Sequence, residues 1–496
     1  MTASEQLLTQ SALELRRRIG SKEISPVELL EACIARIARI NPAINALTAT
    51  CYERAAAEAK AAEHAALRGE ALGLLHGLPI GIKDLEETAG LLTTYGSPLY
   101  RDFIPERDNA MVARVRAAGA IIIGKTNVPE FGAGANTRNV VWGATGNPFN
   151  PMLNAGGSSG GSAAALACDL VPLCTGSDTG GSLRIPAAKC GVVGFRPSPG
   201  LVPVERRSLG WTPISVVGPM GRTVADACLL LAVQAALDDC DPLSYPVDAR
   251  AFALPEARDL GSLRVAYSED FGVCPVDLPI RKVFRDKISA MRHLFRSCDE
   301  VEFDFGEADR CFDVIRAANY VAKYRAAYDK DPASLGPNVR SNYEMGAKMT
   351  MADMAWAHCE QTNMFRRFQQ TFRDYDLVFA PTTPVSPFPW LQPYLAEMDG
   401  KPLKNYYHWL ALTYVITLVT NPAIALPCGA DHMGMPFGLQ VVGPFRGDRA
   451  LLGAAHALEQ AFNAMTELRR PQPDLSKLTQ PVPELKSIVT HPPERS

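Results

Sequence analysis

The hydrophobic residues near the N-terminus recur with the spacing of a helix. In "SPVELLEACIARIARI", residues 25–40, Ser25, Pro26 and Glu28 stand in the order that caps and begins a helix. The side chains of Ser25 and Glu28 can accept hydrogen bonds from the free N–H groups of the first turn, and Pro26 has no N–H that needs a partner. A second, alanine-rich helix follows and ends at Gly69. We therefore expect residues 1–70 to form an N-terminal helical layer. The hydrophobic positions of the first helix are Leu29, Leu30, Cys33, Ile34, Ile37 and Ile40.

After residue 70, short hydrophobic runs alternate with amphipathic segments. Runs that are hydrophobic throughout and separated by helices are typical of an α/β fold whose layered sheet is buried on both faces. Residues 71–496 are expected to form this α/β core, in one structural domain overall. The expected strands span 77–84, 121–123, 169–176, 262–268, 376–381, 422–427 and 437–443, and the expected helices span 223–237, 278–295, 350–374 and 448–463.

Residues 310–375 stand apart because their pattern is helical almost throughout. The segment is also rich in aromatic side chains, which suit two roles: packing inside the core, or covering a pocket. Its aromatic residues include Tyr320, Tyr324, Tyr328, Trp356 and Phe365.

Composition narrows the class of protein further. The chain has 496 residues, of which 47% are hydrophobic, enough for a large buried core, and its net charge is −3 with a pI of about 6.3. This charge argues against a nucleic-acid-binding surface. The twelve cysteines contain no Cys-x-x-Cys pair, which indicates a reducing compartment and neither a disulfide framework nor a zinc site.

Two segments bear on the cellular location. The N-terminus, "MTASEQLLTQSALELRRRIG", lacks the apolar stretch of a secretory signal. The most hydrophobic late stretch, "LALTYVITLVTNPAIALP", is interrupted by threonines, Asn421 and Pro422, so we interpret it as buried core and not as a membrane span. A cytoplasmic protein without membrane attachment is therefore expected.

Residues 154–190 are unusually rich in glycine and serine, and three interpretations can be weighed against one another. A flexible linker is disfavoured because "AAALACDLVPLC" in its middle is core-like. A phosphate-binding loop needs a lysine after its glycines, and no lysine lies between Lys125 and Lys189. The α/β-hydrolase nucleophile elbow formally fits 157–161, but "GNPFNPMLNAG" before it is a poor strand, although His432 and His456 could complete a triad.

The second half of this stretch, "GSDTGGSLR", favours an acyl-transfer site. Thr179, Gly180 and Gly181 directly precede Ser182, and glycines there let several backbone N–H groups converge near the hydroxyl. Such donors form an oxyanion hole, which stabilises the negative charge that develops during acyl transfer. Ser182 is therefore a candidate nucleophile, which needs an adjacent base.

The same residues belong to a longer set of motifs. "GLPIGIKD", "RVRAAGAIIIGKTNVPEFG", "WGATGNPFNP", "GGSSGGSAAALA", "GSDTGGSLRIPAAKCGVVGFRPS", "GPMGRTVADACLLL", "NPAIALPCG" and "GMPFGLQVVGP" follow in this order. From about residue 10 to about residue 465 the chain resembles the amidase signature family. The resemblance implies one large α/β/α layered domain with a mixed, twisted central sheet covered by helices on both faces.

The resemblance also implies a catalytic triad and a mechanism. Ser182 would be the nucleophile, Ser158 a bridging serine that follows a cis peptide bond from Gly157, and Lys83 the base, with no metal and no cofactor. Burial behind "LPIGI" should lower the pKa of Lys83 so that it can accept a proton through Ser158 from Ser182. The acyl-enzyme formed on Ser182 would then be hydrolysed by water.

Around this triad the resemblance implies supporting roles. The backbone N–H groups of Thr179, Gly180, Gly181 and Ser182 would form the oxyanion hole. Ser159 would help to hold the network. Asp178 would support the loop, and Arg184 would either anchor the loop or bind a substrate carboxylate.

The substrate is left open by these motifs. We expect a small-molecule amide of small to medium size, mostly apolar or aryl, with a carbamate as a further option. The expected pocket lining comprises Trp211, Tyr320, Tyr324 and Trp390. "YVITLVTNPAIALP" departs from the family's usual pattern, which leaves the shape of the adjoining pocket wall open.

Three alternatives concern partners and activity. The chain could be the glutaminase component of a tRNA-dependent amidotransferase, which takes ammonia from glutamine and needs partner subunits, although "NYEMGAKMTMADMAWAHCEQTNMFRRF" differs from that branch. It could be a non-catalytic binding protein on the same fold, but the triad positions are intact. A homodimer is consistent with the family's habit.

Overall fold

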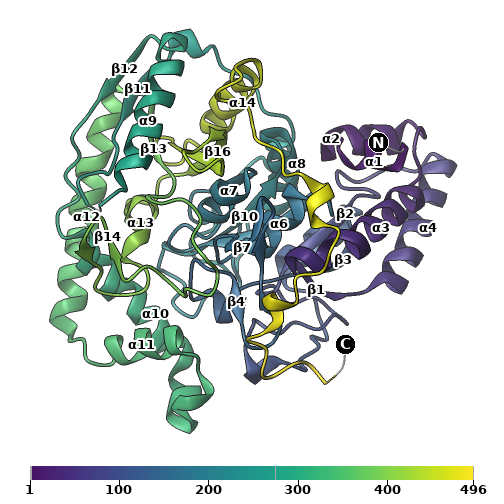
Figure 1. Ribbon diagram of the computed structural model, residues 1–496, viewed down its shortest axis with the longest axis horizontal. Coiled ribbons are helices and arrows are strands. Elements are labelled where there is room, and N and C mark those ends of the chain that lie inside the picture. Colours follow the sequence, from purple (N-terminus) through teal and green to yellow (C-terminus); the bar gives the residue numbers. More distant parts are fainter. Residues whose placement is uncertain (1–2, 274, 495–496) are drawn as a thin grey trace.

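A computed structural model describes residues 3–273 and 275–494. An eleven-stranded sheet runs through the molecule (Figure 1). In spatial order its strands are β1 (Leu47–Thr50), β3 (Ile121–Thr126), β2 (Pro79–Lys83), β8 (Leu173–Asp178), β10 (Val216–Gly221), β9 (Val193–Arg196), β16 (Ala423–Ala430), β17 (Pro436–Val442), β13 (Leu377–Pro381), β11 (Arg264–Tyr267) and β12 (Ser297–Glu300).

The sheet is mixed, as expected. Strands β3, β2 and β8 run parallel to one another, and so do β13, β11 and β12. The strands between these groups pair antiparallel, and β1 is antiparallel to β3 at the edge. Parallel strands need crossover connections, and helices supply them here.

Helices cover both faces of the sheet. On one face α6 (Gly160–Ala167) packs against α7 (Arg184–Cys190), and on the other α8 (Val224–Gln234) packs against α14 (Asp448–Ala464). In β17 and just after it, Gly438 lies against α7 whereas Gly443 lies against α14, because side chains an odd number of residues apart point to opposite faces. The expected α/β/α layering is confirmed.

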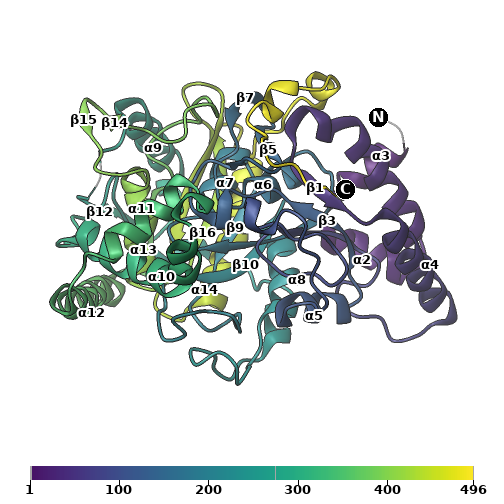
Figure 2. The same cartoon turned by 90° about the horizontal axis from the view of Figure 1, so that it is seen from below.

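The remaining helices form the two ends of the molecule (Figures 1 and 2). At one end lie α1 (Ala3–Leu8), α2 (Ala12–Gly20), α3 (Pro26–Ile44) and α4 (Tyr52–Arg68), with α5 (Ala110–Ala117) near α8. At the other lie α9 (Leu278–Met291), α10 (Ala308–Lys330), α11 (Pro337–Gly346), α12 (Met351–Asp374) and α13 (Ala411–Leu418).

The N-terminal helices begin and end as their sequence predicts. Ser25 Oγ accepts a hydrogen bond of 2.9 Å from the Val27 N–H, with Pro26 as the first helical residue of α3. Gly69 ends α4 in the left-handed conformation, at φ 75°. The purely helical expectation is incomplete, however, because β1 extends the central sheet, and residues of α1–α4 belong to the main hydrophobic core.

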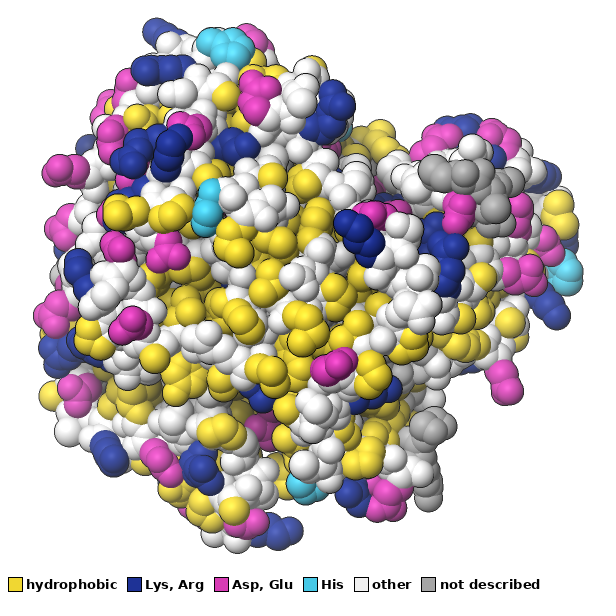
Figure 3. Space-filling view, viewed as in Figure 1, with side chains coloured by type: hydrophobic (Ala, Val, Ile, Leu, Met, Phe, Trp, Pro, Cys, Tyr) yellow, Lys and Arg dark blue, Asp and Glu magenta, His cyan; other side chains and the backbone are white. Residues whose placement is uncertain are grey.

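The surface shows no segregation of charge on the face seen in Figure 3. Acidic and basic side chains alternate around its edges, and hydrophobic side chains gather toward its centre. No helix in the described part of the chain is long and apolar enough to cross a membrane. The stretch 410–427 is buried throughout except at Thr420, as expected for core.

Candidate active site

Lys83 reaches the site because two parallel strands end at the same edge of the sheet. β2 pairs in parallel with β8, with Ile80 opposite Leu173. Lys83 is the last residue of β2, and Ser177 and Asp178 are the last two of β8. The carboxyl ends of neighbouring parallel strands lie side by side, so residues almost a hundred positions apart meet there.

Ser158 and Ser159 arrive from a different element. They directly precede α6, which packs on β2 and β8. Close packing is feasible because Gly161 lies against the backbone of Asn127, where a Cβ atom has no room. The peptide bond between Gly157 and Ser158 is cis, as the resemblance implied.

The amine of Lys83 is the centre of a cluster of hydroxyl groups. Its Nζ lies 2.8 Å from Ser158 Oγ, 2.7 Å from Ser159 Oγ and 2.9 Å from Ser177 Oγ. The Lys83 side chain is fully buried, and no carboxylate among the described residues lies within ion-pair distance of it. A lysine surrounded by neutral hydroxyls can exchange a proton with them without first breaking an ion pair.

The environment of Lys83 lowers its pKa to about 7. Burial is the main cause, because desolvation disfavours the ammonium form. The negative charges of Glu86 and Asp178 oppose this effect and raise the pKa. A large share of Lys83 is therefore neutral near pH 7 and able to accept a proton.

Ser182 lies on the loop between β8 and α7 and faces a cavity of about 570 Å³. Ser158, Ser177 and Thr179 line the same cavity. The Ser159 N–H donates a 3.3 Å hydrogen bond to the Ser182 carbonyl oxygen, which ties the start of α6 to the Ser182 loop. The structure thus places Ser158 and Ser182 in the cavity lining, with Lys83 buried behind Ser158 at hydrogen-bond distance.

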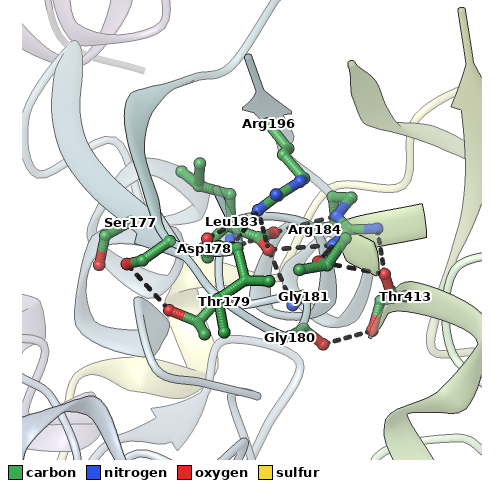
Figure 4. Close-up of polar contacts among 12 residues, drawn as sticks. Ser177, Asp178, Thr179, Gly180, Gly181, Leu183, Arg184, Arg196 and Thr413 are labelled. Carbon is green, nitrogen blue, oxygen red and sulfur yellow. Dashed lines mark hydrogen bonds and ion pairs between the residues drawn. The ribbon is translucent and has the colours of Figure 1, made fainter. Parts of the chain in front are cut away.

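Asp178 holds the Ser182 loop in shape (Figure 4). Its carboxylate accepts hydrogen bonds from the N–H groups of Gly181 (2.9 Å) and Leu183 (3.2 Å) and from the guanidinium groups of Arg184 (2.9 and 3.0 Å) and Arg196 (3.2 Å). Burial alone would raise the pKa of Asp178, but the two guanidinium groups hold it well below its usual range. Asp178 is therefore ionised.

Arg184 anchors the loop and is not placed to bind substrate. It is fully buried, and besides Asp178 it donates to the Thr413 carbonyl (2.9 Å), Thr417 Oγ1 (3.1 Å) and Gln440 Oε1 (2.6 Å). It does not line the cavity. Of the two roles expected for Arg184, the structure supports the anchor.

The four expected oxyanion donors are not equivalent. The Gly181 N–H donates a 2.9 Å hydrogen bond to Asp178, so, contrary to expectation, it is not free to serve as an oxyanion donor. In the described part of the chain, the N–H groups of Thr179, Gly180 and Ser182 have no hydrogen-bond partner. Thr413 Oγ1 lies 2.6 Å from the Gly180 carbonyl oxygen and 2.9 Å from that of Leu410, and its single proton is donated to the nearer one, Gly180, which ties this loop to α13.

Aromatic side chains form much of the cavity wall, but only two of the four expected ones. Tyr320 and Tyr324 of α10 line it. Trp211 does not line it and is 79% exposed to solvent. Trp390 is wholly buried in a separate hydrophobic cluster with Ala144 and Leu485. The aromatic lining that was not predicted consists of Tyr95, Tyr100 and Phe131.

A family model described as Amidase matches residues 28–452 of this chain. The chain belongs to the amidase signature family. It is therefore a hydrolase that acts on amides.

Individual relatives of this amidase carry different names. It is 34% identical to an acylamidase of Rhodococcus erythropolis, over 90% of this chain and 94% of that protein. It is also 34% identical to a glutamyl-tRNA(Gln) amidotransferase subunit of Acaryochloris marina (strain MBIC 11017), over 93% and 99%. Among solved structures, a bacterial aryl acylamidase of the amidase signature family matches with a TM-score of 0.84 at 26% identity, covering 97% of this chain and 98% of that one.

Ser177 is one of the polar residues at this amidase's site that the motifs did not point to. Its hydroxyl lies 2.9 Å from the Lys83 amine, and it lines the cavity. The signal was available, since Ser177 sits within "GSDTGG" beside a residue expected to support the loop. Its position beside Lys83 follows only from the parallel pairing of β2 and β8, which the sequence alone does not reveal.

A metal site does not coincide with the cavity. Among the described residues, Asp238, Asp239 and Cys240 are grouped closely enough to share an ion. They are consecutive in the chain, two of them are exposed, and none lines the cavity of the amidase.

Proposed function

We propose that this amidase hydrolyses a carboxylic amide through an acyl-enzyme on Ser182. The observation that carries the proposal is the fully buried Lys83 amine, 2.8 Å from Ser158 Oγ and with a pKa near 7. Such an amine is a suitable general base, because its pKa lies near the pH at which it must work.

The first half of the reaction forms the ester. Neutral Lys83 takes the proton of Ser158, Ser158 takes that of Ser182, and Ser182 Oγ attacks the amide carbon. The N–H groups of Thr179, Gly180 and Ser182 stabilise the oxyanion. The C–N bond then breaks, and the proton returns from Lys83 through Ser158 to the leaving amine.

The second half releases the acid. A water molecule gives a proton to the same Ser158–Lys83 relay and attacks the acyl carbon. The ester bond to Ser182 breaks, and Ser182 Oγ recovers a proton through Ser158. One amide and one water give one carboxylic acid and one amine, without a metal or redox step.

The cavity wall supports a mostly apolar or aryl substrate of small to medium size. Phe131 lies opposite α10, with its ring centroid 4.9 Å from that of Tyr324. Tyr95 and Tyr100 continue this wall, 6.1 and 5.9 Å from Phe131. Ring faces and edges of this kind bind flat hydrophobic groups.

A second candidate is the glutaminase role within a tRNA-dependent amidotransferase, favoured by the 34% identity to a component of such an enzyme. The two candidates share the triad and differ in substrate and in the need for partner subunits. They are therefore distinguished by activity of the isolated chain.

The test is hydrolysis by purified protein of aryl amides, aliphatic amides, a carbamate and glutamine, with Ser182→Ala and Lys83→Ala measured alongside. We expect turnover of a simple amide that is lost in both variants. Activity confined to glutamine and dependent on added subunits would favour the second candidate. Activity that survives Ser182→Ala would refute the mechanism.

A further inference from the structure

A buried cation in the cavity wall has no acidic partner. Arg316 of α10 lines the cavity, its side chain is only 7% exposed, and no carboxylate of the described residues lies within ion-pair distance of it. A guanidinium keeps its charge at any physiological pH. Buried charges in proteins are normally paired, so an unpaired one beside a cavity favours the binding of an anion there.

The hydrogen bonds of Arg316 involve two of its three nitrogens. Its Nε donates to Asn342 Oδ1 (3.0 Å), and its Nη2 donates to the hydroxyls of Tyr320 (2.9 Å) and Tyr406 (2.7 Å). Nη1 has no hydrogen-bond partner in the described part of the chain. The three neutral contacts fix the guanidinium plane and leave one nitrogen for a ligand.

The surroundings hold this geometry firmly. The rings of Tyr320 and Tyr407 lie 5.0 and 4.8 Å from the Arg316 guanidinium carbon, and those of Phe312 and Tyr406 lie 5.8 Å from it. Rings stabilise a cation by their quadrupoles but do not neutralise it. The site is therefore rigid, positively charged and shielded from bulk solvent.

The carboxylates near Arg316 accept hydrogen bonds from other groups. Asp313, one turn earlier on α10, accepts hydrogen bonds from Tyr407, His408 (3.0 Å) and Asn405 (3.3 Å). Glu130, which lies toward Tyr320, accepts from Ser97 Oγ and the Gly336 N–H, each at 2.8 Å.

Three acids also line the cavity. Glu86 accepts a hydrogen bond from Asn109, Glu87 accepts one from Tyr95 at 2.9 Å and pairs with Arg206, and Glu205 accepts one from the Ala110 N–H at 3.1 Å. None of these carboxylates lies within ion-pair distance of Arg316, so its charge remains available to a ligand.

Arg316 also lies close to the reacting loop. Phe312, whose ring is next to the guanidinium, packs against Gly180, where an added Cβ would lie 3.2 Å from the ring. One aromatic ring thus lies between the Arg316 guanidinium and the loop that carries Ser182. Arg316 and Ser182 both line the same cavity of about 570 Å³, so one small molecule in it can meet both.

We infer that the substrate of this amidase carries a carboxylate, which binds Arg316, in addition to the amide that is cleaved. The inference rests on the proposed function and narrows its substrate class to apolar or aryl amides with a free acid group. Lys323, two turns further along α10, lines the same cavity but is exposed to solvent, and it is the natural control.

The test compares matched substrates by kcat/KM. Acetanilide is paired with 4-acetamidobenzoate, and butyranilide with succinanilic acid, so that the acid lies on the amine side or the acyl side. We expect wild type to prefer the acid in at least one pair by about tenfold or more. Arg316→Met should reduce that ratio by about tenfold. Arg316→Lys should reduce it by less, because lysine keeps the positive charge but cannot make the paired hydrogen bonds of a guanidinium group.

Several outcomes would overturn the inference. They are a wild type without preference for either acid, an unchanged ratio in Arg316→Met, or a preference abolished only by Lys323→Met. If Arg316→Met does not fold, Arg316→Lys carries the comparison, and a ratio unchanged from wild type counts against the inference.

Binding separates this inference from the proposed function. Calorimetry with Ser182→Ala should show tighter binding of the preferred acid than of its neutral partner. If wild type hydrolyses neither substrate and no other compound of the panel above while this difference in binding persists, the proposed function fails and the carboxylate site stands. If both are hydrolysed equally well, the proposed function stands and the carboxylate site fails.

Discussion

The hydroxyl of Thr413 donates a 2.6 Å hydrogen bond to the carbonyl oxygen of Gly180 and thereby joins α13 to the loop that carries Ser182. Both groups are buried. Thr413 directly precedes "YVITLVTNPAIALP", residues 414–427, the segment that departs from the usual family pattern.

Thr413→Val should therefore lower kcat more than it changes KM. The substitution keeps the shape but leaves the Gly180 carbonyl without its partner, and we expect a loss of about tenfold in kcat. Steady-state kinetics on a simple amide measure this. Thr413→Ser, which restores the hydroxyl, should recover most of the activity, and equal loss in both variants would contradict the explanation.

The pKa of Lys83 predicts the pH dependence of catalysis. Burial lowers this pKa to about 7, so the base is protonated and inactive below that pH and neutral above it. We expect kcat/KM to rise with pH through a midpoint near 7. A pH–rate profile on an uncharged amide checks this, and a flat profile from about pH 5 to about pH 9 would rule out Lys83 as the base.

Gly132→Ala should impair catalysis through Ser158. Gly132 has a φ of 74°, and an added Cβ would lie 3.0 Å from Leu85 Cδ1 and 3.3 Å from Ser158 Oγ. We expect kcat to fall about tenfold or more as the serine is displaced. Gly400→Ala is the matched control, since its φ of 71° imposes the same backbone strain with nothing within 4 Å. Equal kinetic effects in the two variants would show that strain alone is responsible.

Lys189 should make stability depend on pH. It is buried, its Nζ has no hydrogen-bond partner among the described residues, and it lies 4.7 Å from the Phe388 ring centroid and 5.1 Å from that of Trp409. Burial lowers the pKa of Lys189 to about 7. The unfolded chain, with a lysine pKa of about 10.4, then binds the proton more tightly than the folded chain does. Stability conferred by this site therefore increases as the pH rises from about 7 to about 10.

Lys189→Met should raise Tm by about 2 °C or more at pH 7, and this gain should shrink as the pH approaches 10. Thermal unfolding at several pH values measures the difference. Lys282→Met, at an exposed lysine paired with Asp286, should leave Tm nearly unchanged. A gain for Lys189→Met that does not vary with pH would mean that the protonation of Lys189 is not its origin.

Asp178→Asn should destabilise the fold strongly. It leaves the buried Arg184 and Arg196 without their anion, which costs about 3–5 kcal/mol in the free energy of unfolding. Denaturant unfolding measures this cost. Asp286→Asn, which breaks an exposed pair, should cost no more than about 1 kcal/mol. Similar costs for the two variants would contradict the role given to Asp178.

The periodic parts of the chain were predictable from sequence, and the irregular ones were not. Helix α3 and strands such as β2 and β17 follow hydrophobic spacing and capping residues closely. Strand β10, "VVGPMG", was missed because its glycines and Pro219 disguise it, although it pairs with strands on both sides. Its burial depends on the strands that pair with it, and not on the pattern of its own sequence.

The same limit applies to the site. The motifs pointed to Ser158 and Ser182, which line the cavity, and to Lys83, which is hydrogen-bonded to Ser158, but they did not distinguish Tyr320 from Trp390 as wall residues. Which way an aromatic side chain faces depends on how its helix or loop packs. Thr413 and Arg316 were missed for that reason, since each meets the site only through tertiary packing.

The cavity is assembled from two separate lengths of chain. Lys83, Ser158, Ser177 and Ser182 come from the first two hundred residues, whereas α10 supplies a wall from residues 308–330. Substitutions on α10 can therefore alter which molecule fits while the proton relay stays intact. The substrate range of an amidase of this kind can therefore evolve by substitutions on α10 alone, while the catalytic residues stay unchanged.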